Sequence, residues 1–426
     1  MRVDLYRIFV FLGTVWGLTF VLLMIDTNLS DPTKFERSDY VMHFYVAGYL
    51  VRTGQASILY PTANDPSLAE SAFNRAAHSL LPQLSKDAIS VFGYSPLLAW
   101  VLFQPLSIFR PHISLLAWQG ISIIALILSA LFLSRASESK VKSSDILFLS
   151  SLFLPTIATL WSGQLSLVIG LLSLSAGYLL LRKNHPAVAG LVWSFLILKP
   201  QFLPLAALVT LALALGGRFQ CLIGLALGLI GIIAADIIVV PLTVNIHWLH
   251  SMRLIEFIFS TGSYAIPTHL MTCLPVNLLL VLPIESRALF KPFVYGAAAL
   301  LWLTGLWQCK KIAHSNLDEF SKLSLILTVG LFLLPLTSPR LLYYDLCLFL
   351  PVGVILLLGK DWAPSQSISL RRIALIVWIS ISVYMLVFMN VAPNPALPLA
   401  LLAILLVLFV ELLRCVNIIR AGSRPL

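Results

Sequence analysis

The sequence predicts an all-α, polytopic integral membrane protein with about twelve transmembrane helices. Hydrophobic residues make up 59% of the 426 residues and charged residues only 11%, and the mean hydropathy is +0.95. The surface of a water-soluble domain of this length does not tolerate such a composition. Apolar stretches also recur along the whole chain, with short basic tracts between them. Most side chains are therefore expected to face lipid or the interior of a helical bundle.

Thirteen apolar segments are candidates for the membrane-spanning helices, although several are shorter than the ~20 residues of a straight span. They are residues 8–25, 94–109, 113–134, 146–160, 165–181, 186–198, 202–217, 221–241, 290–308, 323–336, 346–358, 373–391 and 398–413. No small-x-small cleavage site follows the first of them, so we interpret it as a helix rather than a signal peptide.

Basic tracts such as Lys310-Lys311 and Arg371-Arg372 fall on one side of this arrangement, which predicts that this side is cytoplasmic. Thirteen crossings would leave Arg2 and Arg7 outside, so we expect between eleven and thirteen spans. One explanation is that 94–109 is re-entrant. The other is that the weakly basic tract 135–142 lies outside.

The formal net charge of +10 comes from these short tracts, which indicates membrane topology and not nucleic-acid binding. The five cysteines show no CxxC spacing, so neither a disulfide framework nor a zinc site is predicted. We see no DxD-like acidic pair for a metal, and no cofactor is expected.

Two long outer segments, 26–93 and 242–289, interrupt what we interpret as a single membrane domain over 1–426. The aromatic run Tyr40–Arg52 in the first loop predicts a helix in the membrane interface. A second surface helix is predicted within 65–84.

Asp39 directly precedes this aromatic helix, where a carboxylate can face a lipid-borne substrate. The alternative is that Ser38 or Asp39 merely caps the helix N-terminus.

Polar residues also break the apolar runs at three other outer positions, and a last outer turn adds an arginine and an aspartate. The breaks are Phe92 to Leu97, Ser162-Gly163-Gln164 and Leu198 to Gln201, and the turn is Thr337 to Asp345. Each break can be a simple turn. Lys199, however, opposes the topological bias, and such a lysine usually has a partner. Arg340 and Asp345 can pair with each other.

These features occur in an order that resembles the C-type glycosyltransferases, most closely glycosyltransferase family 87, the polyprenol-phosphate-mannose-dependent α-mannosyltransferase-like membrane proteins. The matching residues are Asp39, Phe44 to Gly48, Leu59-Tyr60, Tyr94 to Leu97, Gly163-Gln164, Ala189-Gly190, Lys199-Pro200, Ser338-Pro339 and Tyr344-Asp345-Leu346. The region 242–289 fits the family pattern poorly.

The resemblance implies a hexosyltransferase that moves a sugar from a polyprenyl-phosphate donor to an extracytoplasmic glycan or glycolipid acceptor. It implies an inverting mechanism with Asp39 as the catalytic base, and no metal. It further implies a multi-pass protein of the plasma (inner) membrane, with the active site on the extracytoplasmic face.

The chemistry of this reaction also needs cations for the departing phosphate. Lys199 and Arg340 are the candidates, with His269 and His247 as weaker ones. Six further residues are expected to line the substrate site: Tyr45, Tyr94, Gln164, Gln201, Tyr344 and Asp345.

The main competing interpretation is a secondary transporter or lipid-linked sugar flippase, for which an ionisable residue such as Asp236 within an apolar segment is typical. The sequence contains no pair of similar halves, which disfavours it. A non-catalytic membrane scaffold is the third possibility.

Overall fold

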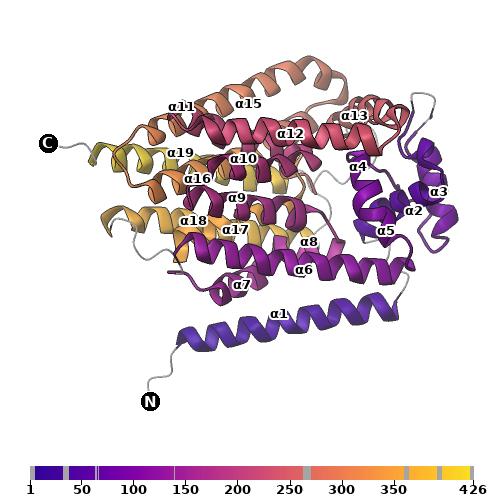
Figure 1. Ribbon diagram of the computed structural model, residues 1–426, viewed down its shortest axis with the longest axis horizontal. Helices are drawn as coiled ribbons and strands as arrows, with labels where there is room; N and C mark the ends of the chain where they lie inside the picture. Colours follow the sequence, from indigo (N-terminus) through magenta and orange to yellow (C-terminus); the bar gives the residue numbers. More distant parts are fainter. Residues whose placement is uncertain are drawn as a thin grey trace.

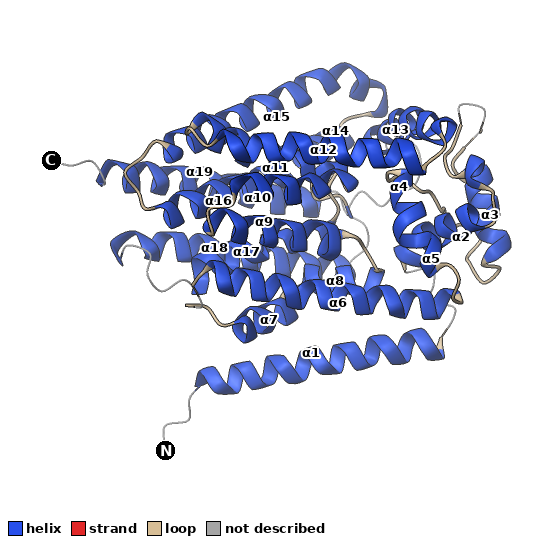
Figure 2. Ribbon diagram, viewed as in Figure 1, coloured by secondary structure: helices blue, strands red, loops and turns tan. Residues whose placement is uncertain are grey.

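The computed structural model describes residues 5–31, 38–62, 65, 67–138, 140–261, 270–358, 364–390 and 396–422. The long helices lie side by side along one direction, with the start of α1 and the end of α19 at one end of the bundle (Figure 1). The short helices α2 to α5 gather at the other end. The described residues form helices and loops without a strand (Figure 2), apart from a single bridge between Met271 and Leu342.

The α-helices are α1 (Leu5–Ser30), α2 (Val46–Arg52), α3 (Ala72–Leu80), α4 (Pro96–Leu98), α5 (Gln104–Leu106), α6 (Pro111–Ala136), α7 (Ser143–Leu152), α8 (Leu154–Ser162), α9 (Leu172–Arg182), α10 (Pro186–Trp193), α11 (Leu203–Leu215), α12 (Phe219–Val239), α13 (Leu242–Thr261), α14 (Leu274–Leu280), α15 (Ile284–Ala313), α16 (Glu319–Thr337), α17 (Leu350–Gly353), α18 (Pro364–Asn390) and α19 (Ala396–Gly422). Short π-helical stretches are Tyr40–Tyr45, Ala99–Phe103, Ser166–Leu171 and Val354–Leu358, and 3₁₀ stretches are Ala56–Ile58, Ser194–Leu198, Pro200–Phe202 and Tyr343–Phe349.

Seven of the described helices are long and apolar enough to cross a membrane, which confirms a polytopic helical membrane protein. An eighth span results if α7 and α8, which meet at a 77° bend, are taken together. The predicted total of about twelve is not confirmed, because other apolar segments form helices of only 10–17 residues. One of them, Pro96–Leu106, has a length of about 16 Å, roughly half the hydrocarbon thickness.

The predicted helix over Tyr40–Arg52 is present and begins with a π-helical stretch. The polar segment 65–84 contains the shorter helix α3, whose N-cap Ser71 accepts a hydrogen bond from the Asn74 backbone N–H. The segment 242–289, which is predicted to lie on the outer side, contains the helices α13 and α14 and the start of α15. Its position outside the membrane stays a prediction.

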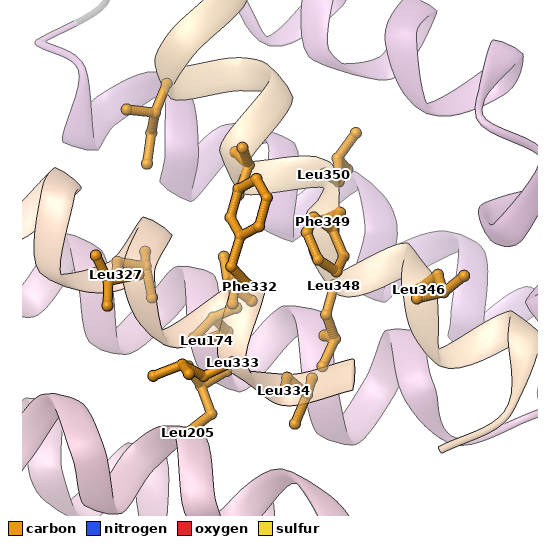
Figure 3. Close-up of a cluster of buried hydrophobic side chains, with 14 of the residues drawn as sticks. Leu174, Leu205, Leu327, Phe332, Leu333, Leu334, Leu346, Leu348, Phe349 and Leu350 are labelled. Carbon is orange, nitrogen blue, oxygen red and sulfur yellow. The ribbon is translucent and has the colours of Figure 1, made fainter. Parts of the chain in front are cut away.

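The core is centred on α16. Of the 18-residue apolar stretch that makes this helix a candidate span, 78% is buried inside the protein. Its side chains pack against helices that come from distant parts of the chain, and the Phe332 and Phe349 rings are 5.7 Å apart. Figure 3 shows Phe332, Leu333 and Leu334 of α16 beside Leu346, Leu348 and Phe349 of the 3₁₀ stretch, with Leu174 of α9 and Leu205 of α11 nearby. The core therefore holds the segment Tyr343–Phe349 firmly in place.

Glycines allow α10 and α12 to approach each other closely. A Cβ atom on Gly224 would lie 1.9 Å from the Ala187 carbonyl oxygen, and one on Gly190 would lie 2.0 Å from the Cys221 carbonyl oxygen. Backbone atoms cannot move aside as a flexible side chain can, so no other residue fits this crossing.

We predict that Gly224→Ala lowers the thermal stability of the detergent-solubilised protein, because overpacking against backbone typically costs about 1–3 kcal/mol. Gly231→Ala, on the same helix but with nothing within 4 Å of its Cβ position, is the matched control. It should leave the melting temperature unchanged or slightly raised, since alanine favours helix. Equal melting temperatures for the two variants would contradict the close packing.

Candidate functional site

Three breaks in the helical bundle meet at the end that carries α2 to α5. The first break follows α8 at Gly163. The second lies at Lys199, between two 3₁₀ stretches, and the third follows α16 at Ser338. The Thr159 hydroxyl donates to the Tyr344 carbonyl oxygen at 3.0 Å, which joins the first break to the chain after the third. The Ser338 hydroxyl lies 3.5 Å from the Gln201 carbonyl oxygen, which joins the third to the second.

Gly163 shapes the turn that directs Gln164 toward the first outer segment. Its φ of +68° lies in the left-handed region, and a Cβ atom there would come within 2.5 Å of the Cβ of Tyr40. The indole N–H of Trp118 donates to the Gly163 carbonyl oxygen at 2.8 Å. The turn is therefore fixed by close contact on one side and a hydrogen bond on the other.

The Gln164 side chain bridges Asp39 and Tyr94. Its amide Nε2 donates to Asp39 Oδ2 at 2.5 Å, and its Oε1 lies 3.4 Å from the Tyr94 hydroxyl, which donates to it. Burial raises the pKa of Tyr94, so its hydroxyl stays protonated and remains a donor at neutral pH. The fold thus brings three predicted site residues together, although Asp39 is 125 residues and Tyr94 is 70 residues from Gln164 along the chain.

Asp39 does not cap the helix that follows it. It occupies the N-cap position, yet its side chain accepts no hydrogen bond from the first turn. The hydroxyl of Ser38, instead, lies 3.5 Å from both the Val41 backbone N–H and the Ser162 carbonyl oxygen. The capping interpretation is therefore wrong for Asp39, whose partly exposed carboxylate is turned toward Gln164.

His43 is a member of this cluster that the sequence analysis missed. The pKa of His43 is lowered, and burial of the ring is the largest cause. The negative charge of Asp39 raises this pKa, whereas the positive charge of Arg340 lowers it. The Val91 backbone N–H donates to His43 Nδ1 at 3.1 Å, so the neutral ring carries its proton on Nε2. The spacing of four residues from Asp39, about one helical turn, is a signal that could have identified it.

Arg340 approaches the same cluster from the third break. One guanidinium nitrogen lies 3.6 Å from the position that a Cβ of Gly93 would occupy, next to Tyr94. Its positive charge acts on both His43 and Tyr94, and lowers the pKa of each. The structure thus gathers Asp39, Tyr94, Gln164 and Arg340, with His43 among them.

Lys199 and Asp345 form an ion pair in which both side chains have 0% exposure. Ser166 accepts from the Lys199 ammonium at 2.7 Å and donates to Asp345 Oδ1 at 2.6 Å. The other carboxylate oxygen of Asp345 accepts from the Leu342 backbone N–H at 3.1 Å and so caps the 3₁₀ stretch. The suggested pairing of Asp345 with Arg340 is wrong, because the Asp345 carboxylate forms its ion pair with Lys199.

The remaining predicted residues lie as follows. The Tyr344 ring is 4.9 Å from the Lys199 ammonium, and Gln201 follows Lys199 within the second break. The hydroxyl of Tyr45 donates to the Phe109 carbonyl oxygen at 3.1 Å and so is not directed at Asp39. His247 is an exposed residue of α13, whereas His269 lies outside the described residues.

Asp236, which the sequence marked as an ionisable residue within an apolar segment, supports the site from α12. Its Oδ1 accepts from the Leu97 backbone N–H at 3.1 Å and lies 3.4 Å from the Ser95 hydroxyl. Asp236 thereby gives a hydrogen-bond partner to a backbone N–H at the N-terminus of α4, which begins two residues after Tyr94. Asp236 thus has a structural partner, and a transport pathway is not needed to explain it.

The sequence matches the model of glycosyltransferase family 87 over residues 92–339, which is 248 of the 426 residues. The chain belongs to glycosyltransferase family 87. This membership identifies a membrane glycosyltransferase and decides against the transporter interpretation. No curated protein and no solved structure matches the chain.

The matched region of this family 87 protein includes Tyr94, Gln164, Lys199 and Gln201. Asp39 and the segment from Arg340 to Asp345 lie outside it, and the fold brings them back to the matched residues through the contacts described above.

We predict that Lys199→Met destabilises the protein by about 3–5 kcal/mol, because it leaves the Asp345 carboxylate buried without its countercharge. The double variant Lys199→Met/Asp345→Asn should recover most of this loss, since the amide oxygen still caps the 3₁₀ stretch. Thermal unfolding in detergent measures both. If Lys199→Met melted like the wild type, the ion pair would not be the main role of Lys199.

Proposed function

We propose that this family 87 protein transfers a hexose from a polyprenyl-phosphate donor to the hydroxyl of an extracytoplasmic glycan or glycolipid, with inversion at the anomeric carbon. The observation that carries the proposal is the orientation of Asp39. Its carboxylate is partly exposed, is not used as a helix cap, and faces a cluster that contains the cation Arg340. The choice of mannose as the sugar rests on the resemblance of the motifs alone.

In the proposed reaction the acceptor O–H gives its proton to Asp39 as the acceptor oxygen attacks the anomeric carbon. A new C–O bond forms while the bond from the anomeric carbon to the phosphate oxygen breaks, and the polyprenyl phosphate leaves with the electron pair. Gln164 holds one oxygen of Asp39, so the carboxylate enters the reaction in a fixed orientation. A single base is sufficient, because phosphate leaves as an anion that needs no proton.

We assign the departing phosphate to Arg340. A guanidinium forms charge-assisted hydrogen bonds to phosphate oxygens, which become more negative as the bond breaks. The sequence also suggests Lys199 for the same role, but its ammonium is buried and held by Asp345 and Ser166. We therefore propose that Lys199 acts indirectly, since it fixes Asp345 and thereby the segment that begins at Arg340.

We propose that the site faces the extracytoplasmic side of the plasma (inner) membrane. The basic residues Arg182, Lys310 and Arg420 lie at or near the ends of α9, α15 and α19, and cytoplasmic segments retain such residues. A reporter that is active only in the cytoplasm should give a signal when it is fused after residue 426 and none when it is inserted at Asn64. Matching signals would overturn this orientation.

We predict that Asp39→Asn slows sugar transfer at least about a hundredfold, the usual effect of losing a general base. The stability should change little, because the amide oxygen can still accept from Gln164 and no capping bond is lost. Transfer of labelled sugar from a polyprenyl-phosphate donor, in a membrane extract that supplies acceptors, measures the rate.

The matched control is Asp87→Asn, the same change at an exposed carboxylate of the first outer segment. It should transfer sugar at the wild-type rate. A wild-type rate for Asp39→Asn itself would remove this residue from the mechanism, and the family membership would still stand.

We predict that Arg340→Gln weakens binding of the polyprenyl-phosphate donor about 10- to 100-fold, as expected for the loss of one charge-assisted hydrogen bond. Titration of the purified protein with donor measures the dissociation constant. Arg110→Gln, which removes an exposed cation just before α6, should bind normally. Unchanged binding by a folded Arg340→Gln protein would place the phosphate elsewhere.

A further inference from the structure

Helices α15 and α19 end at the end of the bundle away from the short helices α2 to α5 (Figure 1). A basic pocket of about 370 Å³ is formed by residues at these two helix ends. Trp307, Lys310 and Lys311 of the last turns of α15 line it, together with His314 and Asn316 after that helix and Arg420 of α19. None of its lining residues is acidic. We infer that this pocket binds the phosphate group of an anionic phospholipid.

The charges in the pocket favour an anion. Three permanent cations share a small volume, and the negative end of the α15 dipole, roughly half a charge, offsets only part of them. The nearest acids in the sequence are engaged elsewhere. Glu319 pairs with Arg218 at 2.6 Å and Lys322 at 3.3 Å, and Asp318 caps α16.

The surroundings of the pocket favour a lipid as the source of that phosphate. The indole of Trp307 is 52% exposed, and the ammonium groups of Lys310 and Lys311 lie 5.5 Å and 5.1 Å from its ring. Leu303 and Leu300, one and two turns earlier on the same face of α15, are 53% and 67% exposed. An acyl chain can follow this apolar stripe while its headgroup occupies the pocket.

The test compares lipid binding by the full-length protein and by Lys310→Gln/Lys311→Gln/Arg420→Gln. Both are placed in nanodiscs of phosphatidylcholine with a minor fraction of cardiolipin, and native mass spectrometry counts the cardiolipin that stays bound after release. We expect about a hundredfold weaker cardiolipin binding by the triple variant, from roughly fivefold for each lost cation. Equal binding by wild type and triple variant would overturn the inference.

Two controls make the result specific to this pocket. Arg371→Gln/Arg372→Gln removes another basic pair, near the start of α18, and should bind cardiolipin as the wild type does. Lys310→Arg/Lys311→Arg keeps the charge and should also bind, which separates loss of the site from loss of folding. Inorganic phosphate should not displace cardiolipin, and displacement at millimolar concentration would overturn the assignment to a lipid and indicate a soluble phosphate.

Discussion

The buried ion pair between Lys199 and Asp345 holds together the part of the molecule on which the site depends. Two unpaired charges in this position would each cost several kcal/mol, so neither residue is tolerated without the other. Through Ser166, which bonds to both, the pair joins the chain after Gly163 to the chain after Ser338. The segment with Arg340 and the segment with Gln164 are thereby held at a fixed separation, although neither Arg340 nor Gln164 is part of the ion pair itself.

The breaks in the helices are subject to the same constraint, namely that a buried polar group needs a partner. A break exposes backbone N–H and C=O groups that lipid cannot satisfy, so it is stable only where protein supplies partners. Here the partners include side chains of other helices: Trp118 of α6 donates to the Gly163 carbonyl oxygen, and Asp236 of α12 accepts from the Leu97 N–H. A helix next to a break can be short because its free backbone groups find partners in the protein, and Gln164, directly after one break, bonds to Asp39.

Composition and periodicity predicted the fold class and the helix over Tyr40–Arg52, because these depend on local sequence and on the solvent. The number of spans was not predictable from hydropathy, which does not show where a short helix is completed by its neighbours. The grouping of two candidate residues was predictable, while their roles stay predictions. Asp39 and Gln164 stand out in the sequence by their positions in outer segments, and they meet in the structure. The pairing of Lys199 with Asp345 links positions 146 residues apart, and local sequence contains no signal for that contact.

The π-helical stretch Tyr40–Tyr45 explains how Asp39 differs from other carboxylates of the first outer segment. The wider winding, with bonds that span five residues, is common at functional sites. Its aromatic side chains pack on one side, where Tyr40 stacks on Trp118 with ring centroids 5.8 Å apart. This packing fixes the rotation of the stretch, and Asp39 and His43 then face the cluster of Gln164 and Arg340. A solvated carboxylate on a mobile loop would have to be ordered in each reaction cycle, whereas this one is already held in orientation by the core that surrounds it.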